Sequence, residues 1–310
     1  MMLNTPTTVK PKGKKQFRGV TRAARIIQAL SFYIPLIVMI FIVILAIFAD
    51  LAWLGLPDVG LSPHDPTVGK ITDRYLPPAF MEGGKSEYWL GTDQLGRDIL
   101  SRLIYGARIS LSVSLLAIFI TASIGTILGI LAGYAGGRLD AFIMRTVDVA
   151  LSFPGLLLAM LLAVAIGPGY WTVVFALSIL GWAGYARMIR GEALRIAQSD
   201  FVAQARVNGA SGWRIMLRHI FPNIVNSLIV LMTLQVGMMI LAEAALSYLG
   251  IGISVPTPSW GSMVSDGRAN LDRAWWISAF PGIAIGLVVM SGNFLGDWIR
   301  DRLDPRLRRL

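Results

Sequence analysis

The chain has 310 residues, no cysteine and 28 basic against 18 acidic residues, which gives a formal net charge of +10. Hydrophobic residues make up 55% of the chain and its mean hydropathy is +0.64. Length alone would allow two water-soluble domains, but this hydropathy argues against them. The absence of cysteine excludes disulfide bonds and thiolate metal sites.

Several apolar runs approach the ~20 residues that a helix needs to cross a bilayer. The sequence therefore predicts an all-α polytopic membrane protein with six transmembrane helices. The predicted spans are 31–54, 109–134, 147–166, 172–188, 224–250 and 276–296. The first is too long for a signal peptide, so we interpret it as a retained anchor. Pro154 lies inside the third span, which is tolerated where neighbouring helices satisfy the backbone.

The distribution of Lys and Arg predicts the orientation, because these residues concentrate on the cytosolic side. Residues 1–30 hold seven basic residues and no acid, and they are expected to form a cytosolic tail that is disordered over 1–20. Residues 55–106 are then an extracytoplasmic loop, 107–297 a domain of five helices, and 298–310 a second cytosolic tail. The basic charge is thus a topology signal, and nucleic-acid binding is the weaker interpretation.

The predicted outer loop contains two informative stretches. Residues 83–86 read GGKS, like the end of a phosphate-binding loop, but the glycine that the motif requires is Ala79. We therefore expect no catalytic site in this chain and no ATP hydrolysis by it alone. The stretch Trp89–Leu111 places apolar residues near helical spacing, which predicts an amphipathic helix at the outer membrane surface leading into the second span.

Small and acidic residues mark the predicted spans. Glycines recur every four residues at 125, 129 and 133, and again at 282 and 286, which allows close helix approach within the chain or against another subunit. Glu243 lies well inside a span, where a charge costs roughly 2.5–3.5 kcal/mol on insertion scales. It is predicted to line a pathway, to carry a proton, or to be neutral and hydrogen-bonded. No other metal-ligating residues cluster with His64 or His219 in the sequence, so no metal site is predicted.

Residues 191–222, between the fourth and fifth spans, are polar and yet keep a helical pattern. Ser199 and Asp200 are N-cap types before a helix to about Asn208, and Gly209 follows as a left-handed C-cap. Ser211 caps a second helix that is expected to end near Pro222. Residues expected to face the bundle are Phe201, Val202, Ala205, Trp213, Leu217 and Ile220, whereas Arg206, Asn208, Arg214 and Arg218 face outward. This helix–glycine–helix corner has a shape suited to docking in another protein's groove.

The corner resembles the cytoplasmic loop of permease subunits of ATP-binding-cassette importers, whose motif is E-A-A, three residues, Gly, nine residues and I-x-L-P. Gly209 and Pro222 keep the motif spacing, whereas the E-A-A positions read Ala203, Gln204 and Ala205. His219 and Phe221 replace the motif's Ile and Leu. Four further stretches make residues 30–308 similar to the C-type permease subunit of dipeptide and oligopeptide importers: LGTDQLGRDILSRLIYGARISL, EAALSYLGIG, PTPSWGSMV and WWISAFPGIAIGLVVMSGNFLGDWIRDRLDPRLR. In that branch the E-A-A positions are loosely kept.

The resemblance implies a type I importer permease with the MetI-like fold, in the bacterial inner membrane and with both termini cytosolic. It implies a homologous second permease, two cytosolic ATPase subunits that bind ATP and Mg, and an extracytoplasmic binding protein, with no cofactor in this chain. The ATPase-coupling residues would be Ala205, Arg206, Asn208, Gly209, Ala210, Ser211 and Trp213, with Glu243 a possible pathway residue. The alternatives are a metal-chelate or oligosaccharide cargo, a proton-coupled secondary transporter using Glu243, or a non-transporting scaffold.

Overall fold

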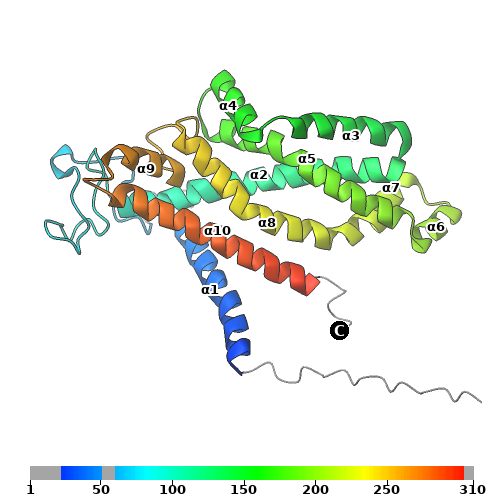
Figure 1. The fold of residues 1–310 in the computed structure, drawn as a ribbon, viewed down its shortest axis with the longest axis horizontal. Coiled ribbons are helices and arrows are strands. Elements are labelled where there is room, and N and C mark those ends of the chain that lie inside the picture. The colour runs from blue at the N-terminus through cyan, green and yellow to red at the C-terminus, as the bar shows by residue number, and fades with distance from the viewer. Residues whose placement is uncertain (1–21, 51–59, 304–310) are drawn as a thin grey trace, which may run out of the picture.

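The computed structural model describes residues 22–50 and 60–303 as an elongated helical bundle (Figure 1). Within these residues the only β-pairing is one isolated bridge between Thr92 and Asp98, which agrees with the all-α prediction. The helices are α1 (Arg22–Ile47), α2 (Ile99–Ala135), α3 (Gly137–Ser152), α4 (Gly155–Ile166), α5 (Tyr170–Ala197), α6 (Asp200–Val207), α7 (Gly212–Ile215), α8 (Phe221–Tyr248), α9 (Trp260–Gly267) and α10 (Trp276–Leu303). Short 3₁₀ turns cover Ile71–Asp73 (η2) and Arg268–Asn270 (η4), and a π-helical turn covers Met216–Ile220 (η3).

The number of membrane-crossing segments agrees roughly with the six predicted. Among the described residues α2, α5, the helical segment Gly212–Tyr248 and α10 are long and apolar enough to cross a membrane. The bent pair α3–α4 supplies a fifth candidate, and the apolar part of α1, Ser31–Ile47, is a shorter segment. The end of the predicted first span at 51–54, the predicted disorder of 1–20 and the last residues of the C-terminal tail lie outside the described residues.

The third predicted span is wrong as a single straight helix. α3 ends at Ser152, the backbone is extended at Phe153 and Pro154, and α4 leaves at an angle of 85°. Proline disfavours helical backbone in the residue before it and lacks an N–H donor, so the chain turns at this point. α3 then lies against α5, where the Arg190 guanidinium donates to both carboxylate oxygens of Asp140 at 3.0 and 2.6 Å.

The two glycine stripes have different surroundings. Gly125, Gly129 and Gly133 face α5, and a Cβ at Gly129 would lie 2.8 Å from the Ala186 carbonyl oxygen. That stripe therefore brings α2 and α5 together within the chain, as small residues do in membrane bundles. A Cβ at Gly282 or Gly286 of α10 would meet no described atom within 4 Å.

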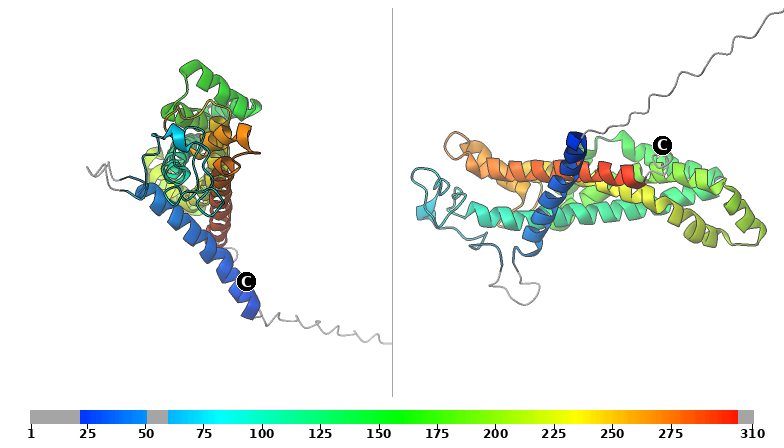
Figure 2. Two further views of the ribbon diagram at one scale, coloured as in Figure 1. Left: turned by 90° about the vertical axis from the view of Figure 1, so that its left-hand side faces the viewer. Right: turned by 90° about the horizontal axis from the view of Figure 1, so that it is seen from below.

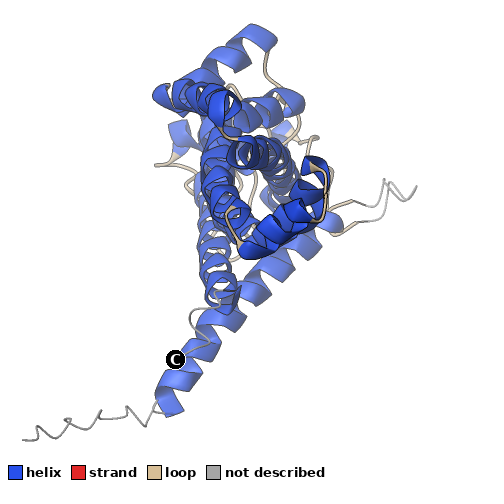
Figure 3. Ribbon diagram, turned by 90° about the vertical axis from the view of Figure 1, so that its right-hand side faces the viewer, coloured by secondary structure: helices blue, strands red, loops and turns tan. Residues whose placement is uncertain are grey.

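The bundle has two distinct ends. Residues 60–98, called the outer segment below, lie with α9 at one end, and the corner formed by α6 and α7 lies at the other (Figures 1 and 2). Seen from the corner end, α1 leaves the bundle at an angle (Figure 3). Its second half still packs on the core, where Ile42 and Ala46 join Ile99, Ala107 and Trp276.

Candidate functional site

The backbone of the corner is closed by a glycine C-cap and a serine N-cap. The Ala210 N–H donates to the Ala205 carbonyl and the Gly209 N–H donates to the Arg206 carbonyl, both at 3.0 Å. Gly209 has φ +76°, so this is the Schellman arrangement that favours glycine. The Ser211 Oγ accepts from the Arg214 N–H at 3.4 Å at the start of α7. The predicted caps at Gly209 and Ser211 are confirmed.

Beneath the corner lies a core of isoleucine and valine. Val202, Ile215 and Ile220 are fully buried and pack with Ile189 and Ala193 of α5. Burial of such side chains is worth about 1.5–3 kcal/mol each, so the corner is held firmly on α5.

The predicted inward face of the corner is only partly right. Val202 and Ile220 are buried and Ala205 is half-buried, but Phe201, Trp213 and Leu217 are exposed. Trp213 has 62% of its surface accessible, because Ile215 and not Trp213 takes the buried position on α7.

The expected helix end near Pro222 is also wrong. α7, the π-helical turn and α8 form one continuous helical segment, Gly212–Tyr248, in which Pro222 stands in the first turn of α8. The Phe221 N–H donates to the Met216 carbonyl in the wider π-type pattern just before the proline. The π-helical turn just before Pro222 lets the helix continue past a residue that has no N–H to donate. The corner is therefore joined rigidly to a membrane-crossing helix.

The seven residues predicted to couple all lie within this corner. Asn208, Gly209 and Ser211 are exposed, as are Arg206 and Trp213, whereas Ala205 and Ala210 are half-buried. The Arg206 guanidinium also lies 5.2 Å from the centre of the Tyr134 ring, at the end of α2.

Sequence reasoning missed Val207, whose side chain is 86% exposed at the tip of α6. The sequence did not indicate Val207, because it belongs neither to the residues predicted to face the bundle nor to those predicted to face outward.

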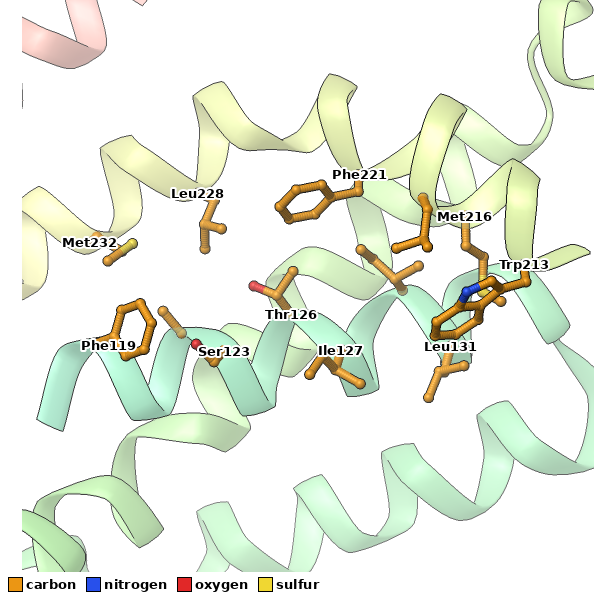
Figure 4. Close-up of a pocket in the computed structure, with 13 residues that line it drawn as sticks. Phe119, Ser123, Thr126, Ile127, Leu131, Trp213, Met216, Phe221, Leu228 and Met232 are labelled. Carbon is orange, nitrogen blue, oxygen red and sulfur yellow. The ribbon is translucent and has the colours of Figure 1, made fainter. Parts of the chain in front are cut away.

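An apolar groove of about 360 Å³ runs from the corner along the bundle between α2 and α8 (Figure 4). Trp213, Met216 and Phe221 line it from the corner side, Ile127 lines it from α2, and Phe119 of α2 lies at the far end near Met232. Trp213 thus belongs to the corner and to the groove, so that a displaced corner would also displace the groove wall.

Glu243 lies near the other end of α8 and has no exposed surface. Its Oε1 accepts from the Ser247 hydroxyl at 2.8 Å, and Ser110 and Ser259 also lie beside the carboxyl. Its Oε2 has no hydrogen-bond partner among the described residues. The carboxyl therefore lies between α2, α8 and the start of α9.

A cluster of ion pairs, in which Asp93, Arg97 and Arg102 are buried, holds the outer segment to the bundle. The Arg97 Nε lies 2.6 Å from the Asp93 carboxylate, and the Arg102 Nη2 lies 3.2 Å from the Asp266 carboxylate on α9. Cross-contacts of 3.6 Å join Arg102 to Asp93 and Arg97 to Asp266. Burial raises the pKa of Asp266, and the two arginines oppose that shift. We call these four residues the outer ion cluster.

The cluster corrects the prediction of an amphipathic surface helix from Trp89. Gly91 and Gly96 adopt positive φ, so the chain is a loop up to Asp98, which caps α2 by accepting from the Ser101 N–H at 2.9 Å. Arg97 and Arg102 point into the protein and not into water. Their partner Asp266 lies 164 residues beyond Arg102, which no local pattern indicates.

Comparison with known proteins places this architecture in a family. Residues 125–309 match the family described as "Binding-protein-dependent transport system inner membrane component". The chain is 44% identical to the dipeptide transport system permease protein of Bacillus subtilis over 250 residues, 80% of this chain and 76% of the relative. It is 40% identical to the di/tripeptide transport system permease protein of Pseudomonas aeruginosa over 88% of this chain and 87% of the relative.

A third relative covers almost the full length. The chain is 37% identical to the probable D,D-dipeptide transport system permease protein of Escherichia coli over 99% of this chain and 98% of the relative. The glutathione transport system permease protein of Pectobacterium atrosepticum is 43% identical over 73% of this chain and 75% of the relative. The chain therefore belongs to the family of binding-protein-dependent transport system inner membrane components, as a non-catalytic permease subunit with membrane-spanning helices.

Proposed function

We propose that the chain is the permease subunit of an ATP-driven importer of dipeptides or short oligopeptides. The observation that carries this proposal is the similarity, over most of the chain, to three permeases whose names specify dipeptide or di/tripeptide transport. One relative is named for glutathione, itself a modified tripeptide, so a short peptide is the cargo that these names share. A metal chelate or an oligosaccharide is the alternative cargo within the same architecture.

The corner is the proposed contact with a cytosolic ATPase. Its backbone is held by two caps and its core is buried on α5, while Val207, Asn208 and Gly209 are exposed. A rigid element with an exposed apolar tip suits a groove in another protein. ATP itself and Mg would be bound by the ATPase subunits, since this chain has no phosphate-binding loop.

Movement of the corner would reach the outer end through one helix. Gly212–Tyr248 is a single segment of 37 residues, which at 1.5 Å per residue is about 55 Å long. It links the corner and the groove at one end to Glu243 at the other. ATP binding by the partner would then shift the bundle between two states by rigid-body motion.

The proposed complex contains a homologous second permease and two ATPases, in an inner membrane with both termini of this chain cytosolic. The apolar groove and the open Gly282–Gly286 stripe of α10 support a second permease, because both leave apolar surface uncovered in this chain. In the cysteine-free chain, Ser86→Cys should react with an impermeant maleimide on intact cells and Ser211→Cys should not. Labelling of Ser211→Cys alone would contradict this orientation.

For Glu243 we propose a positioning role at the junction of α2, α8 and α9, in place of a pathway or proton-relay role. Its complete burial and its bond to Ser247 support this. Glu243→Gln keeps a hydrogen-bonding side chain of the same size and should retain much of the uptake, which should follow ATP. If uptake stops in this variant and also stops with a proton ionophore at constant ATP, the secondary-transporter alternative is favoured.

The decisive experiment is reconstitution with the second permease and the ATPases. This chain alone should not hydrolyse ATP, whereas the complex should show a low basal rate that rises with a peptide-loaded binding protein. The Gly209→Trp variant should assemble and yet uncouple hydrolysis from uptake, because the indole would collide with the ATPase groove that is proposed to receive the corner. A complex that ignores binding proteins loaded with peptides, metal chelates or oligosaccharides would refute the importer proposal. Stimulation by a non-peptide cargo alone would refute only the peptide assignment.

A further inference from the structure

Two exposed aromatic residues lie on the outer segment, at the end of the bundle opposite the corner. Phe80 is 70% exposed and Trp89 is 68% exposed. The Ala79 N–H donates to the Trp89 carbonyl at 3.2 Å, so the backbones of Phe80 and Trp89 are neighbours. Large apolar side chains exposed on neighbouring stretches of a segment outside the bundle are typical of an interaction surface.

The backbone beneath this pair is fixed by contacts on both sides. Asp73 accepts a hydrogen bond from Lys85 and another, at 3.4 Å, from the hydroxyl of the buried Tyr88. The Leu76 N–H donates to the Thr92 hydroxyl at 2.9 Å, and the Thr92 N–H donates to the Leu76 carbonyl at 3.0 Å. Such a surface needs little ordering when a partner binds, which favours affinity.

The position of the pair argues for a protein partner and against lipid. Arg108 pairs with Asp50 at 3.1 Å where α1 ends against α2, which places the outer limit of the apolar bundle near Arg108. α2 continues from there to its start at Ile99, a rise of about 13 Å. The outer segment lies at that end of the molecule (Figure 1), and the buried charges of the outer ion cluster are of a kind that is rare in hydrocarbon.

The stretch of chain between the two aromatic residues carries charges of both signs. Glu82, Lys85 and Glu87 are exposed on the same segment. Aromatic anchors within a polar rim are the usual anatomy of a protein–protein interface.

The family description supplies the partner, because transport in this family depends on a binding protein. The match to the family begins at residue 125, so the outer segment lies outside the matched part. We propose that Phe80 and Trp89 anchor the surface on which the extracytoplasmic binding protein docks. This inference rests on the proposed function and adds a location to it.

The first test measures docking on the assembled complex in lipid nanodiscs. The probe is the purified binding protein that stimulates ATP hydrolysis by the wild-type complex. Phe80→Ala together with Trp89→Ala should raise its half-saturating concentration at least tenfold, since aromatic anchors carry much of the binding free energy of an interface. Leu61→Ala, an exposed apolar residue of the same segment whose N–H bonds to the Phe48 carbonyl, should leave this concentration unchanged. Gel filtration checks that each variant assembles.

The outcomes separate the two proposals. If no binding protein stimulates the wild-type complex, the proposed function fails. If the wild type responds and the double variant responds at the same concentration, the importer stands and the docking surface is wrong.

A second test reports the surroundings of the pair directly. Phe80→Cys provides one labelling site for an environment-sensitive fluorophore in the cysteine-free chain. The emission should shift when the binding protein is added and should be unaffected by brominated lipids. Quenching by brominated lipids without the binding protein would place the pair in the membrane and overturn the inference.

Discussion

Arginine has opposite roles at the two ends of the bundle. Arg97 and Arg102 of the outer ion cluster are buried, Arg102 with only 2% of its surface exposed, and each contacts two carboxylates. Arg214 and Arg218 at the corner are exposed. The outer charges are therefore part of the fold, whereas those at the corner are available to a partner. Damage at the outer end should appear as lost stability, and damage at the corner as lost coupling.

The largest effect is expected from breaking the outer ion cluster. Arg102→Met keeps most of the side-chain volume but leaves Asp93 and Asp266 with one arginine. Removing one partner of a buried ion pair costs about 3–5 kcal/mol. Thermal unfolding in detergent, followed by size-exclusion chromatography, should show a large loss for Arg102→Met.

Arg214→Met is the matched variant at the corner and should unfold at the wild-type temperature. Equal unfolding temperatures for the two variants would mean that the contrast between the ends is false.

A pair of glycines tests the same contrast through the backbone. Gly96 and Gly209 both have positive φ, +73° and +76°. A Cβ at Gly96 would lie 1.9 Å from the Lys70 carbonyl oxygen, whereas a Cβ at Gly209 meets nothing within 4 Å. Asparagine tolerates positive φ, so the space decides the outcome. Gly96→Asn should cost about 1–3 kcal/mol and Gly209→Asn about 0.5 kcal/mol or less, measured by the same unfolding assay. A larger loss for Gly209→Asn would contradict the open surroundings of the corner.

The exposed tip of the corner should affect function without affecting stability. Val207→Asp places a charge where an apolar contact with the ATPase is proposed, and uptake by the reconstituted complex should fall about tenfold, equivalent to 1.4 kcal/mol of docking. The unfolding temperature should not change. Val68→Asp, an equally large change at another exposed valine, on the outer segment, is the control. If both variants lose uptake equally, the loss does not come from the corner.

The smallest effect is a pH dependence confined to the outer segment. The hydrogen bond from Lys85 lowers the pKa of Asp73. Burial opposes this shift, but its effect is smaller. A lowered folded-state pKa means that Asp73 stabilises the fold above its ordinary pKa of about 3.9, and that this contribution is lost as the pH falls through the folded-state value. Amide protection around Asp73 in hydrogen exchange should therefore decrease below about pH 4. Lys85→Met should remove that decrease, and protection at the corner should not follow the same curve.

Local patterns in the sequence were sufficient for the features that depend on one segment. Apolar runs of about bilayer length predict the spans, and the helix stop at Gly209 and the helix start at Ser211 follow from backbone preferences that act over a few residues. The family resemblance also rests on short motifs spread along the chain. None of these features requires knowledge of what lies across the bundle.

Tertiary structure decided which polar residues are buried and which apolar residues are exposed. The spacing of Arg97 and Arg102 suggests a solvent-exposed helix face. Asp93 and Asp266, the second on a distant helix, instead neutralise the two arginines and make their burial possible. Trp213 is apolar and was expected inside, but the space beneath α7 is filled by Ile215. The chain also continues as a helix through Pro222, because a π-helical turn precedes it. These outcomes depend on contacts with distant residues or on the exact hydrogen-bonding pattern of one helical turn. The periodicity of apolar residues in the sequence predicts neither of them.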